Sequence, residues 1–248
     1  MNPQTKLAAL SGLCGAIIAI VAIYAAAALG IFPVNGSAIQ GYLMAHPDIL
    51  IDMTHKLEQQ QADEEDREDR AIQHAVDKLG AKAFFNPKIA YITGPQNAKT
   101  TFVEMFDYNC PYCRASFPYI WEFYQAHKNE ARFAFIEFPI KGADSTFATR
   151  VALAARNQGD KYLALHFALM TEKQHVDAKM ILADAQKVGI DMNKLQADMK
   201  SPEVALGIHD SYALAKAAYI DSTPFFVVDG KIRRGALEAD TLDAMTKG

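Results

Sequence analysis

The chain has 248 residues, of which half are apolar and 22% are charged. This composition is typical of a globular protein with one sizeable core and an appendage, and it argues against an intrinsically disordered chain. The net charge is -4 and no long basic run is present. Proteins that bind nucleic acid concentrate Lys and Arg on one face, so we predict no nucleic-acid partner.

Residues 7–34 contain no charged side chain and are rich in Ala, Ile, Leu and Val. About 20 apolar residues suffice to span a bilayer, whereas the apolar region of a cleavable signal peptide runs about 7 to 15. Lys6 precedes the segment and the next basic residue is Lys56, so the positive-inside bias predicts that the following chain is exported. We predict that residues 1–35 form a signal-anchor transmembrane helix or a signal peptide, and that the protein acts in the periplasm or at the exported face of the inner membrane. Length favours a retained anchor, and cleavage within residues 25–28 is the alternative.

Residues 36–88 have the pattern of a helical stalk rather than of a packed domain. A short helix to Met44 is followed by a longer one that begins at Pro47, where a missing N–H costs nothing. Apolar residues lie three and four positions apart in two stretches: Leu50, Met53 and Leu57, then Ile72, Val76 and Leu79. A narrow apolar seam on an otherwise polar helix predicts a homo-oligomer built by this region. The polar stretch 58–70 is either a solvated helix or a flexible spacer.

Residues 89–248 form the predicted catalytic domain, of the α/β class. The predicted elements are strand 101–106, helix 115–127, strand 132–138, several helices within about 144–219, strands 225–228 and 232–234 around an Asp229-Gly230 turn, and a closing helix from about Leu237. This order is β-α-β, then a helical block, then β-β-α. It predicts a thioredoxin fold with a helical insertion at about 144–219.

The motif Cys110-Pro111-Tyr112-Cys113 lies between a predicted strand and the start of a helix. Two Cys residues at i and i+3 on a first helical turn bring their Cα atoms within the roughly 4.4 to 6.8 Å that a disulfide needs. The helix N-terminus favours a thiolate on Cys110 and lowers its pKa from about 8.5 into a range of roughly 3.5 to 7.5. We predict that Cys110 attacks a substrate disulfide and that Cys113 resolves the mixed disulfide. Cys14, in the apolar N-terminal segment, is interpreted as a small apolar filler.

Three other roles for the cysteine pair compete with this one. A structural disulfide is disfavoured because a two-residue loop restrains the unfolded chain little. Half of a zinc site is disfavoured because there is no second Cys pair and no H-x3-5-H companion. Cu(I) binding by Cys110 and Cys113 stays open, since two thiolates suit that ion. We expect no constitutive metal or cofactor beyond the redox-active disulfide itself.

C-P-Y-C after a strand, together with Ser222-Thr223-Pro224-Phe225 opening a late strand, resembles the DsbA-like family of periplasmic thiol-disulfide oxidoreductases. The resemblance covers roughly residues 89–248. It implies that Thr223-Pro224 is a cis peptide beside Cys110, whose exposed backbone pairs with a substrate segment as an added strand. It also implies that Glu104 is a buried acid that assists proton transfer at the deeper Cys. A trans strand-entry Pro224 and an edge or salt-bridged Glu104 are the alternatives.

Within that family, the helical extension, the C-P-Y-C motif and the Thr before Pro look more like ScsC-type and DsbC/DsbG-type reductase-isomerases than the monomeric oxidase. ScsC-like proteins are associated with copper tolerance, and some are trimers held by such an extension. The resemblance therefore implies a homotrimeric disulfide isomerase or reductase that acts on misfolded or reduced exported proteins. It also implies a membrane thiol-disulfide partner that resets the redox state. A dithiol oxidase and a Cu(I)-binding copper-tolerance protein are the alternatives, and the long uncharged N-terminus departs from the family's pattern.

Overall fold

The computed structural model describes residues 21, 24–26, 36–238 and 241–242. The chain divides into two compact units, Met1–Glu64 and Glu65–Gly248. In the part of the chain that the structure describes, no helix combines the length and the apolar character needed to cross a bilayer. The apolar segment 7–34 lies almost wholly outside the described residues, so the anchor and signal-peptide interpretations stay predictions.

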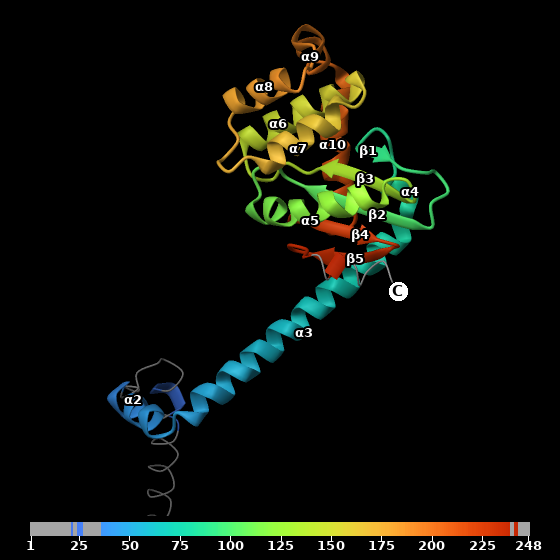
Figure 1. Ribbon diagram of the computed structural model, residues 1–248. Helices are drawn as coiled ribbons and strands as arrows, with labels where there is room; N and C mark the ends of the chain where they lie inside the picture. Colours follow the sequence, from blue (N-terminus) through green and yellow to red (C-terminus); the bar gives the residue numbers. More distant parts are fainter. Residues whose placement is uncertain (1–20, 22–23, 27–35, 239–240, 243–248) are drawn as a thin grey trace, which may run out of the picture. The chain divides into compact units, whose positions relative to one another are not determined.

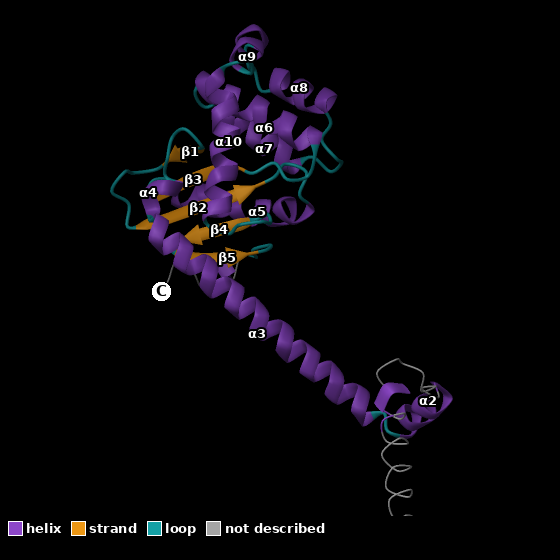
Figure 2. Ribbon diagram, turned by 180° about the vertical axis from the view of Figure 1, so that it is seen from behind, coloured by secondary structure: helices purple, strands orange, loops and turns teal. Residues whose placement is uncertain are grey.

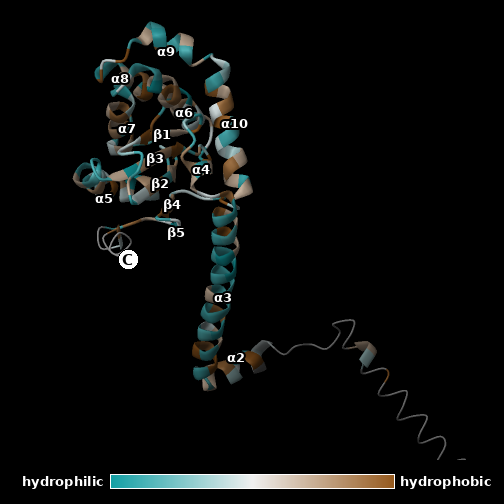
Figure 3. Cartoon of the chain, turned by 90° about the vertical axis from the view of Figure 1, so that its right-hand side faces the viewer, coloured by the Kyte–Doolittle hydropathy of each residue, from teal (hydrophilic) through white to brown (hydrophobic). Residues whose placement is uncertain are grey.

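Helix α2 spans Gly36–Ala45, and helix α3 spans Asp48–Leu79 without interruption. The polar stretch 58–70 is therefore a solvated helix rather than a flexible spacer. Figure 3 shows this middle part of α3 as hydrophilic. N-terminal to this stretch, α2 and the first turns of α3 carry large apolar side chains that are exposed: Ile39, Tyr42, Met44, Leu50, Ile51, Met53 and Leu57.

The second unit contains a mixed sheet and a block of helices (Figure 1). Its strands are β1 (Ala90–Thr93), β2 (Thr100–Phe106), β3 (Ala131–Glu137), β4 (Phe225–Val228) and β5 (Lys231–Arg234). Its helices after α3 are α4 (Ala81–Phe84), α5 (Pro111–His127), α6 (Ala143–Ala155), η1 (Arg156–Gln158), α7 (Lys161–Thr171), α8 (Ala178–Lys187), α9 (Met192–Asp198) and α10 (Pro202–Ala217). Helices α6 to α10 occupy the predicted insertion. Most of the closing helix predicted from Leu237 lies outside the described residues.

The strand order is β1-β3-β2-β4-β5. Strands β2 and β3 are parallel and are connected by α5, while the other neighbouring pairs are antiparallel. This is the predicted thioredoxin-type arrangement with one addition. The sequence analysis missed β1, because four residues between Ile89 and Gly94 are too few to show a period of two.

Successive side chains of the two central strands point to opposite faces of the sheet. On one face Phe102, Phe106, Phe133 and Phe135 pack with α5 and the inserted helices. On the other face Val103, Met105, Ala134 and Ile136 pack with the ends of α3 and α10. Figure 2 shows the strands with helices on both sides. The aromatic residues of β2 and β3 therefore build the core that supports the C-P-Y-C helix.

The C-terminal part of α3 belongs to the second unit. Ile72 and Val76 are buried against the sheet. The Gln73 side chain donates from Nε2 to the carbonyl of Gly230 (2.7 Å) and accepts from the backbone N–H of Ile232 (3.0 Å). The unit thus begins at Glu65, not near Ile89 as predicted, because residues of α3 cover the sheet. The second apolar stripe packs within its own chain, whereas the apolar side chains of the first stripe and of α2 are exposed.

Candidate functional site

Cys110 is the N-cap of α5 and has an extended backbone, while Pro111 occupies the first helical turn. Proline suits this position because its absent N–H would have no helical partner there. Both Cys110 and Cys113 are free thiols, the reduced state of the pair. Neither cysteine has exposed surface, whereas Tyr112 between them is 65% exposed. A substrate sulfur therefore reaches Cys110 only if the groups around it shift.

The pKa of the Cys110 thiol is lowered to about 5. The largest cause is a hydrogen bond from the Cys113 side chain, and burial acts in the opposite direction. The Thr223 side chain and the backbone N–H groups of Tyr112 and Cys113 lower the pKa further. These N–H groups are free because they lie in the first turn of a helix. At neutral pH Cys110 is thus a thiolate, the nucleophilic form of cysteine.

This ionisation predicts the pH dependence of alkylation. We expect the rate of Cys110 modification by iodoacetamide to be half-maximal near pH 5 and to fall below it, because only the thiolate reacts. The midpoint should rise in Cys113→Ala, which lacks the strongest hydrogen-bond donor. Stopped-flow alkylation followed by mass spectrometry measures both. A wild-type midpoint near about 8.5, the value of an ordinary thiol, would contradict this description of the site.

The pKa values of Cys113 and Glu104 are raised, in the opposite direction to that of Cys110. Burial is the main cause that raises the pKa of Cys113, and the hydrogen bond to Cys110 and the charge of Glu104 raise it further. Glu104 is fully buried in the middle of β2, and burial followed by the charge of Cys110 raises its pKa to about 8. Within the described residues neither carboxylate oxygen of Glu104 has a hydrogen-bond partner. Glu104 is therefore a buried acid next to the cysteine pair, not an edge or salt-bridged residue.

A base with a pKa near 8 can accept the Cys113 proton during resolution of a mixed disulfide. We expect Glu104→Gln to slow this step by about 100-fold at pH 7, the lower end of typical general-base contributions. In the wild type the rate of resolution should rise with pH through about 8, because Glu104 must lose its own proton first. Rapid-quench measurement of intramolecular disulfide closure tests this. An unchanged rate in the variant would show that Glu104 takes no part.

The loop before β4 completes the site. The Thr223-Pro224 peptide bond is cis, as the resemblance implied. In its protonated form Cys110 donates from Sγ to the backbone carbonyl of Thr223 across 3.1 Å, so this loop and the C-P-Y-C helix are in direct contact. The Thr223 hydroxyl is buried and helps to lower the pKa of Cys110, so it is placed to donate to the Cys110 thiolate.

Sequence reasoning missed Asp107, which holds the turn between β2 and α5. Its buried carboxylate accepts from the backbone N–H of Asn109 (2.7 Å), the hydroxyl of Ser145 (2.7 Å) and the backbone N–H of Lys141 (2.8 Å). These bonds fix the turn that carries Cys110 against the start of α6. The only sequence signal is an Asp three residues before the motif, which is not specific.

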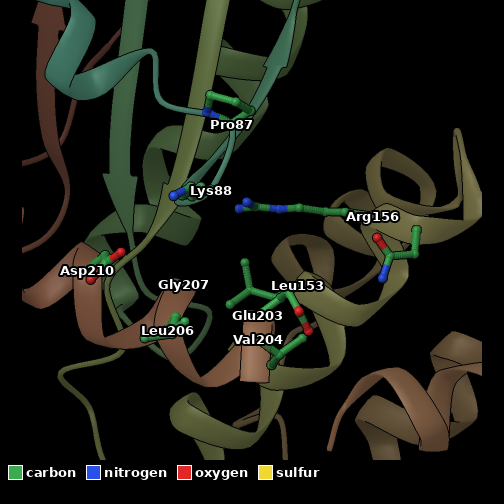
Figure 4. Close-up of a pocket in the computed structure, with 10 residues that line it drawn as sticks. Pro87, Lys88, Leu153, Arg156, Glu203, Val204, Leu206, Gly207 and Asp210 are labelled. Carbon is green, nitrogen blue, oxygen red and sulfur yellow. The ribbon is translucent and has the colours of Figure 1, made fainter. Parts of the chain in front are cut away.

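A cavity of about 410 Å³ lies away from the cysteine pair, between the loop before β1, the end of α6 and α10 (Figure 4). None of the predicted site residues lines it. Arg156 is one of the residues that line this cavity in Figure 4. The guanidinium of Arg156 forms a buried ion pair with Glu137 at the end of β3.

The fold and the site together define a thioredoxin-fold thiol-disulfide oxidoreductase. Residues 101–247 match the family described as the DSBA-like thioredoxin domain, and the chain belongs to that family. Residues 36–64 match the N-terminal domain of the copper resistance protein ScsC. The predicted resemblance to ScsC-type, DsbA-like enzymes is thereby confirmed.

Three known proteins illustrate what this chain is similar to. A thioredoxin-like oxidoreductase from Silicibacter pomeroyi DSS-3 is 38% identical, with a TM-score of 0.63 over 68% of this chain and 96% of that chain. A periplasmic thioredoxin-like protein from Salmonella enterica serovar Typhimurium is 28% identical, with a TM-score of 0.58 over 66% and 92% of the two chains. The Na(+)/H(+) antiporter NhaA of Herminiimonas arsenicoxydans is 31% identical over 161 residues, 64% of this chain and 25% of that protein. The chain spans about a quarter of the length of the first curated relatives that it matches.

Proposed function

We propose that the protein is a periplasmic disulfide isomerase or reductase in which Cys110 is the nucleophile and Cys113 the resolving thiol. The observation that carries this proposal is the opposite shift of two thiol pKa values across one helical turn. One sulfur is ionised and ready to attack, while the other keeps its proton until the mixed disulfide has formed. Buried Glu104, whose charge raises the pKa of Cys113, is the proposed acceptor of that proton.

The proposed reduction of a substrate disulfide has two steps. The Cys110 thiolate attacks one sulfur of a substrate disulfide, forms a mixed disulfide and expels the other substrate sulfur as a thiolate. Cys113 then gives its proton to the ionised Glu104 carboxylate, attacks the Cys110 sulfur and expels the second substrate sulfur as a thiolate. The substrate is reduced and the Cys110–Cys113 disulfide forms. In isomerisation a substrate thiol replaces Cys113 in the second step, and the enzyme returns reduced.

The backbone at Thr223-Pro224 is proposed to dock the substrate. A substrate segment that adds to this loop as a strand would bring its disulfide to Cys110, whose thiol already contacts the Thr223 carbonyl. Tyr112 is exposed beside it and supplies an aromatic surface for the same segment. Pro111, Tyr112, Thr223 and Pro224 are thus proposed to support the two cysteines.

We infer that the isomerase activity depends on self-association through α2 and the first turns of α3. Apolar side chains there are exposed among the described residues, and residues 36–64 match the ScsC N-terminal domain. A trimer is the state that the resemblance favours. Several reduced sites facing one misfolded client raise the effective concentration of thiol.

The experiment compares residues 36–248 with residues 65–248, because the compact second unit begins at Glu65. The substrate is ribonuclease with scrambled disulfides, and sedimentation gives the oligomeric state. We expect the longer chain to be an oligomer that restores ribonuclease activity, and the shorter one to be a monomer that does so at least about tenfold more slowly. If both oxidise a reduced dithiol client and neither unscrambles ribonuclease, the dithiol oxidase is the better assignment.

The periplasmic location and the partners are part of the same proposal. The uncharged segment 7–34 suits export, and the similar Salmonella protein is described as periplasmic. Misfolded or reduced exported proteins are the proposed clients. A membrane thiol-disulfide protein would reset the cysteine pair.

Cu(I) binding is a second proposed role, favoured by the match to a copper resistance domain and by the adjacent thiols of Cys110 and Cys113. Among the described residues no group of three or more His, Cys, Asp or Glu side chains could hold a metal ion, so the two sulfurs would be the main ligands. Binding would have to displace the proton of Cys113, whose pKa is raised. Titration of the reduced protein against a colorimetric Cu(I) chelator should therefore show affinity that increases with pH.

A further inference from the structure

A loop of the helical insertion is tied directly to the residue before Cys110. The loop connects α7 to α8 and spans residues 172–177. The Oδ1 atom of Asn109 accepts from the backbone N–H of Val176 (2.8 Å), and its Nδ2 atom donates to the Val176 carbonyl (3.1 Å). One side chain thus satisfies both backbone groups of Val176, as a neighbouring strand would. The Val176 side chain is fully buried in the main core, so Val176 is held both by this packing and by its hydrogen bonds to Asn109.

Arg114 closes this contact from the other side of the motif. Its Nε donates to the Tyr108 carbonyl (2.8 Å), its Nη1 to the Gln174 carbonyl (2.5 Å) and its Nη2 to the Asn109 side chain (3.4 Å). The planar guanidinium can reach all three acceptors because its donors are held in a fixed fork, which a lysine does not have. Asn109 and Arg114 therefore clamp the loop to the two residues that precede Cys110.

The placement of this clamp indicates a role in substrate binding. Lys173, Gln174 and His175 are exposed and have no regular secondary structure. Figures 1 and 2 both show the α7–α8 connection on the same side of the domain as α5. Cys110 has no exposed surface, so an approaching polypeptide must pass the loops that surround it. The clamp holds one of these loops at a fixed distance from the reacting sulfur.

We propose that Asn109 and Arg114 are positioning residues that hold residues 172–175 as a second substrate-contacting wall beside Cys110. The ligand is an extended polypeptide segment that carries the disulfide, with Thr223-Pro224 as the other contact. This inference rests on the proposed exchange function and adds to it where the substrate chain lies. It predicts that loss of the clamp lowers kcat/KM for polypeptide substrates and leaves the rate with small disulfides unchanged.

The test uses the full chain with Asn109→Ala and Arg114→Lys, and with Asn157→Ala as a matched control. Asn157 donates to Asp198 (3.2 Å) elsewhere in the same insertion and is remote from the loop. We expect both clamp variants to lose about tenfold in kcat/KM with a disulfide-linked peptide, a modest cost for misplacing a binding surface. Their rate with 2-hydroxyethyl disulfide should stay within about twofold of the wild type, and their Cys110 pKa within about 0.3 units. Exchange of the Val176 amide hydrogen should accelerate in Asn109→Ala alone among the three.

A second measurement tests contact directly. A photoreactive amino acid at position 173 should cross-link to a peptide trapped on Cys110 in the Cys113→Ser background, and one at position 157 should not. Equal losses with the peptide and the small disulfide would overturn the proposal, since the two residues would then act on the reactivity of Cys110 rather than on the substrate chain. Absence of a cross-link at position 173 would overturn it too. If the wild type itself fails to react with 2-hydroxyethyl disulfide, the exchange function fails instead.

Discussion

Cys110→Ser is expected to reduce turnover to that of the buffer with every disulfide substrate, because a serine hydroxyl is not ionised at neutral pH and forms no disulfide. Cys113→Ser should behave differently. Its Cys110 can still attack and release one equivalent of substrate thiol, but the mixed disulfide then has no internal thiol to resolve it. The two substitutions change one atom each, at positions in the same helical turn. The difference between them separates nucleophile from resolving thiol.

The measurement is release of thiol from a symmetric chromogenic disulfide by the reduced protein without added reductant. The wild type should give a burst of about two equivalents, one from attack and one from resolution, Cys113→Ser a burst of about one equivalent, and Cys110→Ser none. Both variants replace one sulfur of the Cys110–Cys113 hydrogen bond with a hydroxyl, so thermal unfolding of each provides a control for folding. A burst in Cys110→Ser and none in Cys113→Ser would reverse the two roles.

Glu137→Leu is expected to lower the free energy of unfolding by about 3 to 5 kcal/mol, because it leaves the Arg156 guanidinium buried without its partner. The Glu137 side chain is 1% exposed and that of Arg156 is 12% exposed. Burial raises the pKa of the Glu137 carboxyl, and the charge of Arg156 opposes that rise. Arg156 also donates to the Ile89 carbonyl (3.2 Å) and lies over the Tyr162 ring. These contacts hold the guanidinium in place after its partner is removed.

The double variant Glu137→Leu/Arg156→Met removes both charges and is the matched control. It should recover most of the lost stability, since a buried ion pair replaced by apolar residues is often close to neutral. Urea denaturation of the reduced protein measures all three chains. A double variant no more stable than Glu137→Leu would show that the cost comes from packing at position 137 rather than from an unpaired charge.

The site motif was predictable because its parts lie close together in sequence. Cys110 and Cys113 occupy one helical turn, and their order along the helix already predicts which thiol is ionised. The aromatic residues of β2 and β3 alternate with a period of two, which predicted the central strands. The roles of these cysteines, of Glu104 and of the Thr223-Pro224 loop in the reaction stay predictions until they are measured.

The missed features depend on contacts between distant residues. Strand β1 has four residues and is recognisable only by its pairing with β3. Ile72 and Val76 have the spacing of a seam between helices, but the sheet of the same chain buries them. The bonds of Asn109 to Val176 join residues 67 positions apart, and the insertion between them has no pattern that predicts its return to the motif. Long-range packing, rather than local propensity, decided these cases.

The central claim is that Cys110 attacks a substrate disulfide and that Cys113 resolves the product. The most direct test incubates full-length Cys113→Ser with a disulfide-linked peptide, quenches with acid and maps the adduct by tandem mass spectrometry. The account predicts a single mixed disulfide at Cys110 that persists until an external thiol is added, and no such adduct in the wild type, where Cys113 releases it. An adduct at another residue, or none under conditions in which the wild type turns over, would contradict the account.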